Sequence, residues 1–140
     1  MISVKNALKH IKNNVNLLSN EIISIEKSSN RILAENYHAN FYNPPFNISS
    51  MDGYACRLTD LKKLPKLLNI IGYSIAGKNF EGKISKNETV RVLTGAKIPD
   101  GADIVIIQEN TLNKTEKNIL INKLNLSSYI RKKGLDFKLK

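Results

Sequence analysis

The sequence contains no tryptophan and a single cysteine, Cys56. One cysteine cannot form an intramolecular disulfide, and it cannot supply a cysteine-based metal cage. Long apolar runs are missing too: no segment approaches the length of a membrane span, and no continuous apolar stretch follows the first lysines. These absences fit a reducing compartment and predict a cytoplasmic protein with no membrane partner.

Arginine is scarce although the chain is basic. Only 4 arginines accompany 18 lysines, 18 asparagines and 18 isoleucines, and the net charge is +10. Lysine, asparagine and isoleucine share A/T-rich codons, so codon composition explains the basic excess more simply than selection for a basic surface does. Because the sequence also lacks an aromatic RNA-binding block, zinc-finger spacing and an arginine-lined helix, we expect no nucleic-acid partner. One local cluster could still meet an anionic ligand: Arg131, Lys132, Lys133, Lys138 and Lys140.

The first residues predict an amphipathic helix from about residue 3 to residue 14. Ser3 is a favourable N-cap residue, and apolar side chains follow it at helical spacing, at Val4, Ala7, Leu8, Ile11 and Val15. A strand at 21–25, a short helix at 31–33 capped by Ser28, and an extended segment at 37–39 are predicted next.

The remainder of the chain reads as β structure. Apolar and β-branched runs predict a strand running into a turn over 53–60 and strands at 68–75, 89–93, 104–109 and 119–124, with turns at glycine and proline between them. Residues 134–140 alternate apolar and polar side chains as a strand does and stop without a turn or cap, as at an end imposed by truncation. The predicted fold is α+β, with an N-terminal helix and linker strands over residues 1–42 and a β-rich mixed subdomain over residues 43–140.

Residues 77–83 have the G-x-x-x-x-G-K spacing of a phosphate-binding loop, but the next residue is Ile84 instead of serine or threonine. The residues that follow indicate another turn and not a helix, so the helix N-terminus that would bind phosphate is missing. We expect a β-hairpin with a glycine-bearing loop here.

The stretch from Pro44 to Arg57 has too little periodicity to serve packing alone. Two prolines fix an extended entry, Ser49 and Ser50 supply hydroxyls, and Asp52-Gly53 is a strong turn dipeptide that would display the Asp52 carboxylate. An ordinary Asp-Gly turn explains the same residues.

Two further segments carry candidate groups. The strand ending at Leu93 would deliver the Thr94 hydroxyl to a strand tip, where Gly95 allows close backbone approach, although Thr94 could equally cap its own loop. Arg131 and Asp136 flank Gly134, a spacing that can bring a cation and a carboxylate to one loop; a solvated basic strand is the alternative.

Other polar residues have ordinary explanations. Arg91 and Glu109 are borne by strands and could form a structural pair. His10 and His38 have no second histidine or cysteine at metal-ligand spacing.

Four blocks, taken together and in order, resemble the N-terminal region of the molybdopterin molybdenumtransferases, the MoeA and gephyrin E-domain family. They are Pro44–Arg57, the Arg-x-x-Thr-Gly-Ala block at 91–96, residues 99–109, and the closing block at 130–136. The resemblance covers nearly the whole chain. It implies catalytic roles for Asp52, Thr94 and Asp136, and substrate binding by Ser50, Met51, Arg131 and Lys132. The family's closing motif usually has an acidic residue where Leu135 stands, which puts the polar role of that position in doubt.

The resemblance also implies an activity: insertion of molybdate into adenylated molybdopterin with release of AMP, assisted by Mg²⁺, whose site the sequence does not locate. It implies a homodimer in which this region faces the pterin-binding α/β domain of the partner subunit, a domain that is absent from this sequence. The fragment alone is therefore expected to be inactive. A non-catalytic binding or dimerisation module, or a decaying truncated gene product, remains the alternative.

Overall fold

The structure is a computed structural model that describes residues 1–112 and 115–140. Two compact units make up the chain, Met1–Tyr37 and His38–Lys140, whereas the sequence analysis placed a boundary at residue 42. Neither described range contains a helix of the length and apolar character needed to cross a membrane.

In the first unit, the predicted helix is confirmed as α1 (Val4–Asn14). Ser3 caps it, and its Oγ accepts a hydrogen bond from the Asn6 N–H at 3.3 Å. No residue of α1 is buried, and the apolar stripe that predicted the helix is exposed at Val4, Leu8 and Ile11.

Two other predictions for this part of the chain, the strand at 21–25 and the short helix at 31–33, are wrong. Residues 21–25 form no strand, because Ile22 and Ile25 are exposed and no neighbouring strand pairs with this segment. A short 3-10 helix, Ile25–Lys27, follows instead. Ser28 ends this helix, donating from Oγ to the Ile25 carbonyl at 2.6 Å, and no helix begins at 31–33. Residues 37–39 join no sheet.

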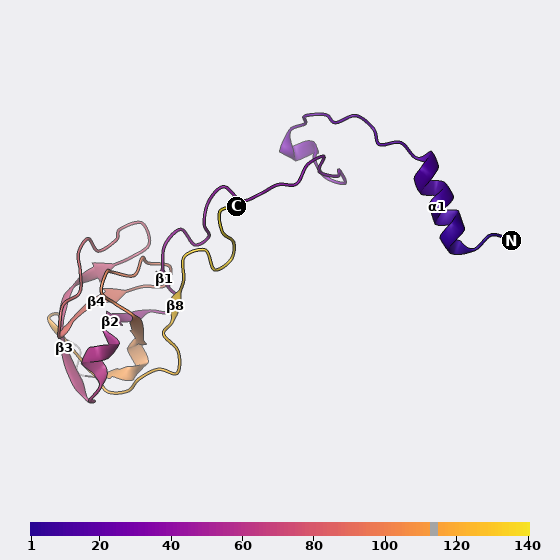
Figure 1. Ribbon diagram of the computed structural model, residues 1–140. Coiled ribbons are helices and arrows are strands. Elements are labelled where there is room, and N and C mark those ends of the chain that lie inside the picture. Colours follow the sequence, from indigo (N-terminus) through magenta and orange to yellow (C-terminus); the bar gives the residue numbers. More distant parts are fainter. Residues whose placement is uncertain (113–114) are drawn as a thin grey trace. The chain divides into compact units, whose positions relative to one another are not determined.

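The second unit is a β structure, with most of its strands in one mixed sheet (Figure 1). Its strands are β1 (Ile48–Ser49), β2 (Gly53–Cys56), β3 (Lys66–Ser74), β4 (Glu88–Val92), β5 (Ile104–Ile107), β6 (Thr111–Leu112), β7 (Asn118–Ile121) and β8 (Ile130–Arg131). Short 3-10 helices, Leu58–Leu61 and Gln108–Asn110, follow β2 and β5. The five longer strands confirm the sequence predictions, and the two-residue strands β1, β6 and β8 were missed.

The main sheet has the order β5-β2-β4-β3-β7-β6, and β1 pairs with β8 in a separate two-stranded ladder. Both faces of the main sheet are covered by apolar residues. Alternation along β2 sends Tyr54 and Cys56 to one core and Ala55 to the other. Burial raises the pKa of the Cys56 thiol to about 12, so this side chain stays protonated as a core residue.

The β-hairpin predicted around residues 77–83 is wrong, because β3 and β4 run parallel. Parallel neighbours need a crossover connection, and residues 75–87 supply it. Ile84 of this connection is 1% exposed and packs with Val90 and Val92 of β4, while the Phe80 ring lies where a side chain at Gly72 would stand. The connection from β3 to β4 is thus held in place by packing against the sheet.

The strand predicted at 134–140 is also wrong. This segment makes a single bridge between Asn43 and Phe137, and the Lys140 N–H donates to the Ala39 carbonyl at 3.2 Å. The end of the chain therefore lies beside the start of the second unit (Figure 1).

The outer edge of β5 is covered by a side chain and a loop. The Asn125 amide donates to the Val105 carbonyl at 2.5 Å and accepts from the Ile107 N–H at 3.3 Å. The Val105 N–H donates to the Ser128 carbonyl at 2.9 Å. Together these hydrogen bonds occupy backbone groups of β5 that would otherwise be free to pair with a further strand.

Candidate functional site

The short strand β1 brings the sequence blocks together. Ile48 pairs with Arg131 of β8 on one side and bridges to Lys97 on the other. The Ser49 N–H donates to the Ala96 carbonyl and the Gly95 N–H donates to the Ser49 carbonyl, each at 2.9 Å. The segment leading to Asp52 is therefore flanked by the Thr94 loop and by the closing block.

Asp52 and Thr94 form a direct contact at the start of β2. Asp52 Oδ1 accepts from the Thr94 backbone N–H at 2.7 Å and from Thr94 Oγ1 at 2.8 Å. These two hydrogen bonds, the backbone one foremost, hold the pKa of Asp52 below its ordinary value. The carboxylate is therefore ionised at neutral pH, and the Thr94 hydroxyl directs its proton to it. In the described part of the chain, Asp52 Oδ2 takes part in no hydrogen bond.

The glycines beside these residues serve purposes other than those predicted. Gly53 is a β2 residue, and a Cβ there would lie 2.1 Å from the carbonyl oxygen of Ile106 on β5. Gly95 has a φ of +83° with nothing within 4 Å of its Cβ position. Close approach thus requires Gly53, whereas a left-handed backbone requires Gly95.

Asp136 and Arg131 form the second contact. Arg131 Nη2 lies 2.5 Å from Asp136 Oδ1, and Asn43 Nδ2 donates to Asp136 Oδ2 at 3.2 Å. Both carboxylate oxygens of Asp136 are thus engaged. Gly134, with a φ of +68°, makes the turn between the pair, and its N–H donates to the Pro44 carbonyl at 2.9 Å.

The remaining predicted residues are placed as follows. Ser50 Oγ donates to the Tyr129 carbonyl at 3.1 Å, so its hydroxyl ties two segments together. Met51 is 37% exposed, and Lys132 is exposed at the turn, where its carbonyl accepts from the Leu135 N–H. Leu135 itself is 59% exposed, an apolar side chain on the surface where the family motif has an acidic one.

The predicted site residues thus form two separate pairs. One is Asp52 with Thr94, and the other is Asp136 with Arg131. Across residues 1–112 and 115–140, no hydrogen bond or ion pair joins one pair to the other. Their connection is the backbone of β1 and its ladder with β8.

Arg91 is linked to the pair of Asp52 and Thr94 through Gln108. Its Nη2 donates to Gln108 Oε1 at 2.8 Å, and its guanidinium lies 4.9 Å above the Tyr54 ring centre. The Gln108 N–H in turn donates to the Asp52 carbonyl at 3.2 Å. The structural pair considered for Arg91 and Glu109 is therefore wrong: the neighbouring Gln108 is the partner.

Sequence reasoning missed the supporting roles of Ser49, Asn43 and Gln108. The contacts of Asn43 and Gln108, and the main-chain contacts of Ser49, join segments far apart in the chain, so no local pattern marked them. Ser49 carried the one available indication, because a serine so close to a displayed aspartate suits a local turn hydrogen bond.

The structure does not locate the magnesium site that the family resemblance implies. Among residues 1–112 and 115–140 there is no group of three or more His, Cys, Asp or Glu side chains able to hold a metal ion. Asp52 and Asp136 belong to different pairs, and Asp136 already has both oxygens engaged.

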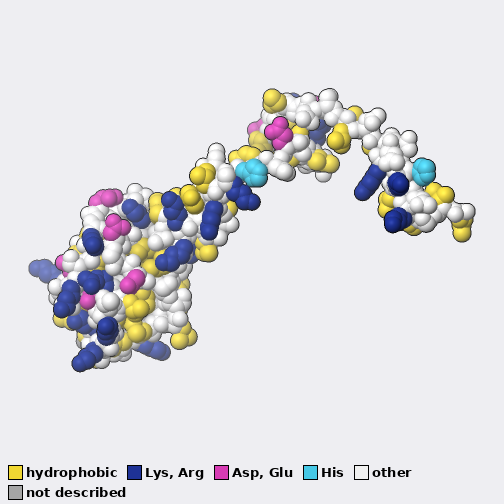
Figure 2. All heavy atoms as spheres, viewed as in Figure 1, with side chains coloured by type: hydrophobic (Ala, Val, Ile, Leu, Met, Phe, Trp, Pro, Cys, Tyr) yellow, Lys and Arg dark blue, Asp and Glu magenta, His cyan; other side chains and the backbone are white. Residues whose placement is uncertain are grey.

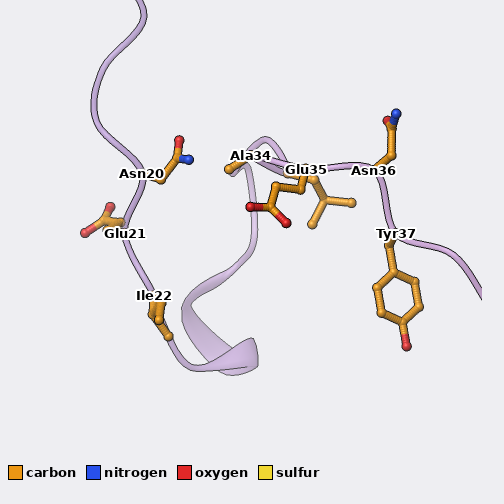
Figure 3. A pocket seen from close by; sticks show the side chains of 8 residues that line it. Asn20, Glu21, Ile22, Ala34, Glu35, Asn36 and Tyr37 are labelled. Atoms are coloured by element: carbon orange, nitrogen blue, oxygen red, sulfur yellow. The ribbon is translucent and has the colours of Figure 1, made fainter.

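A hollow in the first unit contains none of the predicted site residues (Figure 3). Its lining is Asn20, Glu21, Ile22, Leu33, Ala34, Glu35, Asn36 and Tyr37. An ion pair between Glu21 and Arg31 crosses the same unit. On the face seen in Figure 2, Lys and Arg side chains are dispersed over the second unit and interspersed with acidic ones.

Comparison with known proteins identifies this arrangement. The family model described as the MoeA N-terminal region, domains I and II, matches residues 2–140. The chain belongs to this family.

Relatives of this MoeA N-terminal region are found at substantial identity. The molybdopterin molybdenumtransferase of Haemophilus influenzae is 37% identical over 119 residues, which cover 84% of this chain and 29% of the relative. That of Staphylococcus epidermidis is 36% identical over 126 residues, covering 87% and 30%. The chain thus spans about three-tenths of the length of these relatives, 29% and 30%.

Solved MoeA structures share the fold. A molybdopterin biosynthesis moeA protein from Pyrococcus horikoshii OT3 superposes with a TM-score of 0.83 at 28% identity, covering 96% of this chain and 37% of the other. A second such Pyrococcus structure gives a TM-score of 0.77 at 31% identity, with coverages of 99% and 36%. The helix followed by a β-rich unit is therefore the MoeA N-terminal arrangement.

Proposed function

We propose that this chain provides one wall of the site at which a molybdopterin molybdenumtransferase inserts molybdate into adenylated molybdopterin, with release of AMP. This would be a step of molybdenum cofactor biosynthesis. The names of the relatives support the activity class. The observation that carries the proposal is the convergence of the Asp52, Thr94 and Arg131 blocks around β1.

The geometry suits charge placement better than proton transfer. A carboxylate whose pKa lies below its ordinary value is a weak base at neutral pH, so Asp52 would act as a fixed negative charge and hydrogen-bond acceptor. Its Oδ1 is occupied by Thr94, which leaves Oδ2 to meet substrate or water. Thr94 orients this carboxylate and retains its own lone pairs as acceptors.

The second pair would supply positive charge. Asp136 holds the Arg131 guanidinium from one side, and a guanidinium with further N–H donors can bind phosphate or oxyanion groups. Lys132, exposed beside it, adds a second cation. Asp136 would then orient Arg131 instead of touching the reacting atoms.

One wall does not make a complete site. Because the relatives are more than three times as long as the matched region, at 29% and 30% coverage, the rest of such a protein would supply the pterin-binding wall. We infer a homodimer in which the two walls belong to different subunits. Mg²⁺ usually takes only one or two carboxylates from a protein, so the rest of such a protein, substrate phosphates and water would complete its coordination.

A chimera tests the proposal. Residues 2–140 would replace the matching region of the Haemophilus influenzae molybdopterin molybdenumtransferase, and molybdate insertion into adenylated molybdopterin would be measured. We expect turnover by the chimera and none by the 140-residue chain alone. Asp52→Asn in the chimera should lower turnover on the order of 100-fold without unfolding it, the size expected when one preorganised charge is removed.

The matched control is Glu81→Gln, which removes an exposed carboxylate from the β3–β4 connection and should leave turnover unchanged. A folded chimera without activity would favour a non-catalytic module. Equal turnover by the Asp52→Asn and parent chimeras would make Asp52 an ordinary turn residue.

A further inference from the structure

Ser49 is a polar residue buried beside the candidate site, with 1% of its surface exposed. Its Oγ donates to the Met51 carbonyl at 2.5 Å and accepts from the Met51 N–H at 3.3 Å. Both contacts span two residues, so the hydroxyl closes a tight local turn. The turn ends at the residue immediately before Asp52, and it therefore fixes the direction in which the Asp52 side chain leaves the backbone.

The backbone of the same residue fixes the other partner of the Asp52 contact. The Ser49 carbonyl accepts from the Gly95 N–H, and the Ser49 N–H donates to the Ala96 carbonyl, both at 2.9 Å. Thr94 directly precedes Gly95. Ser49 thus holds the Asp52 turn with its side chain and the Thr94 loop with its main chain.

The contact between Asp52 and Thr94 is sensitive to this arrangement. Its two hydrogen bonds, at 2.7 Å and 2.8 Å, converge on one carboxylate oxygen. Hydrogen bonds weaken steeply when donors and acceptors lose alignment, so a shift of the Met51 peptide would disturb both bonds together. The adjacent Ser50 has no such part, because its hydroxyl donates to the Tyr129 carbonyl in another segment.

We propose that Ser49 is a positioning residue that sets the Asp52–Thr94 geometry. Its importance for catalysis rests on the function proposed above. Its effect on Asp52 does not, because that effect can be measured on the chain alone.

The test is the pKa of the Asp52 carboxyl, followed by carbon NMR in the full 140-residue chain. In Ser49→Ala the Met51 peptide loses its side-chain partner, and we expect the pKa of Asp52 to rise toward its ordinary value. The matched control is Thr89→Val, which removes a fully buried hydroxyl that donates to the Ala55 carbonyl at 2.8 Å. This control should lower stability and leave the pKa of Asp52 where it is.

Ser49→Cys keeps a weaker donor at the same place and should shift the pKa of Asp52 in the same direction by less. It decides the question if Ser49→Ala does not fold. A folded Ser49 variant in which the pKa of Asp52 equals that of the parent would overturn the proposal. That result would leave the proposed function standing, whereas an inactive chimera would not affect the measurement on Ser49.

Discussion

Asp52 and Asp136 are both short carboxylates on turns, yet they are held in different ways. Asp52 is bound through one oxygen by uncharged donors of Thr94, at a turn that leads directly into the buried strand β2. Asp136 is bound through both oxygens by the Arg131 cation and the Asn43 amide, on an exposed segment near the end of the chain. The first carboxylate depends on a preformed backbone, and the second depends on a charge partner. Residue type and turn position alone therefore do not assign a role.

The two pairs should differ most in the free energy of unfolding that is lost when the glycine beside each pair is replaced by alanine. In Gly53→Ala the new Cβ would meet the Ile106 carbonyl oxygen at 2.1 Å, and that oxygen is fixed by the pairing of β2 with β5. We expect a loss of about 3 kcal/mol in the free energy of unfolding, at the upper end for an overpacked core. Urea denaturation of the purified variant measures it.

Gly134→Ala is the comparison variant. The nearest atoms to its Cβ are Cδ1 of Tyr42, at 2.8 Å, and Cγ of Lys138, at 3.1 Å, and these side chains can shift more easily than the backbone oxygen that Gly53→Ala would meet. We therefore expect a smaller loss, made up of about 1 to 2 kcal/mol from the strain of its positive φ and the cost of shifting the Tyr42 ring. Equal losses for the two variants would mean that the Asp52 pair is no more dependent on core packing than the Asp136 pair.

An intermediate effect is expected from Thr94→Val, which removes the hydroxyl and keeps the backbone N–H. The backbone N–H is the larger cause of the lowered pKa of Asp52, so the pKa should rise but remain below its ordinary value. Because the folded-state pKa is lowered, the contact contributes its full stability above the ordinary carboxyl pKa. That contribution is lost as pH falls through the folded-state pKa.

NMR titration of the carboxyl and acid unfolding curves check this expectation. Thr59→Val, at an exposed threonine outside the site, is the control and should change neither. A complete return of the Asp52 pKa to its ordinary value would show that the side-chain bond, and not the backbone bond, dominates.

The smallest effect is expected from Asp136→Asn. The ion pair with Arg131 is 41% and 39% exposed, and exposed pairs of this kind contribute about 0.5 kcal/mol. The difference from the parent should shrink further as salt is added, because screening weakens exposed pairs. A loss above about 2 kcal/mol in urea unfolding would mean that the Asp136 contacts hold the closing segment in place.

Much of the fold was predictable where a single segment carried the pattern. Ser3 and the apolar spacing behind it predicted α1, and the run of isoleucines and valine at 104–107 predicted β5. The predictions failed where the structure of a segment depends on its contacts with distant parts of the chain. The alternation at 21–25 finds no strand to pair with, and the glycines at 77 and 82 suggested a hairpin where Phe80 and Ile84 pack the chain into a crossover.

The candidate site was predictable as a set of residues but not as a set of contacts. Family resemblance named Asp52, Thr94, Arg131 and Asp136, and the structure shows how they divide into two pairs. That division depends on β1, whose two residues are too few to produce a sequence pattern. It also depends on Ser49, whose contacts with Gly95 and Ala96 join positions more than forty residues apart in the printed sequence.

The side-chain closure of β5 has a consequence for self-association. An exposed sheet edge offers a row of free N–H and C=O groups to any other extended chain. Here Asn125 engages the Val105 carbonyl and the Ile107 N–H, and the Ser128 carbonyl takes the Val105 N–H. A foreign strand must displace all three hydrogen bonds before it gains any. Asn125 and its loop thereby protect the β5 edge of the sheet from pairing with a strand of another molecule.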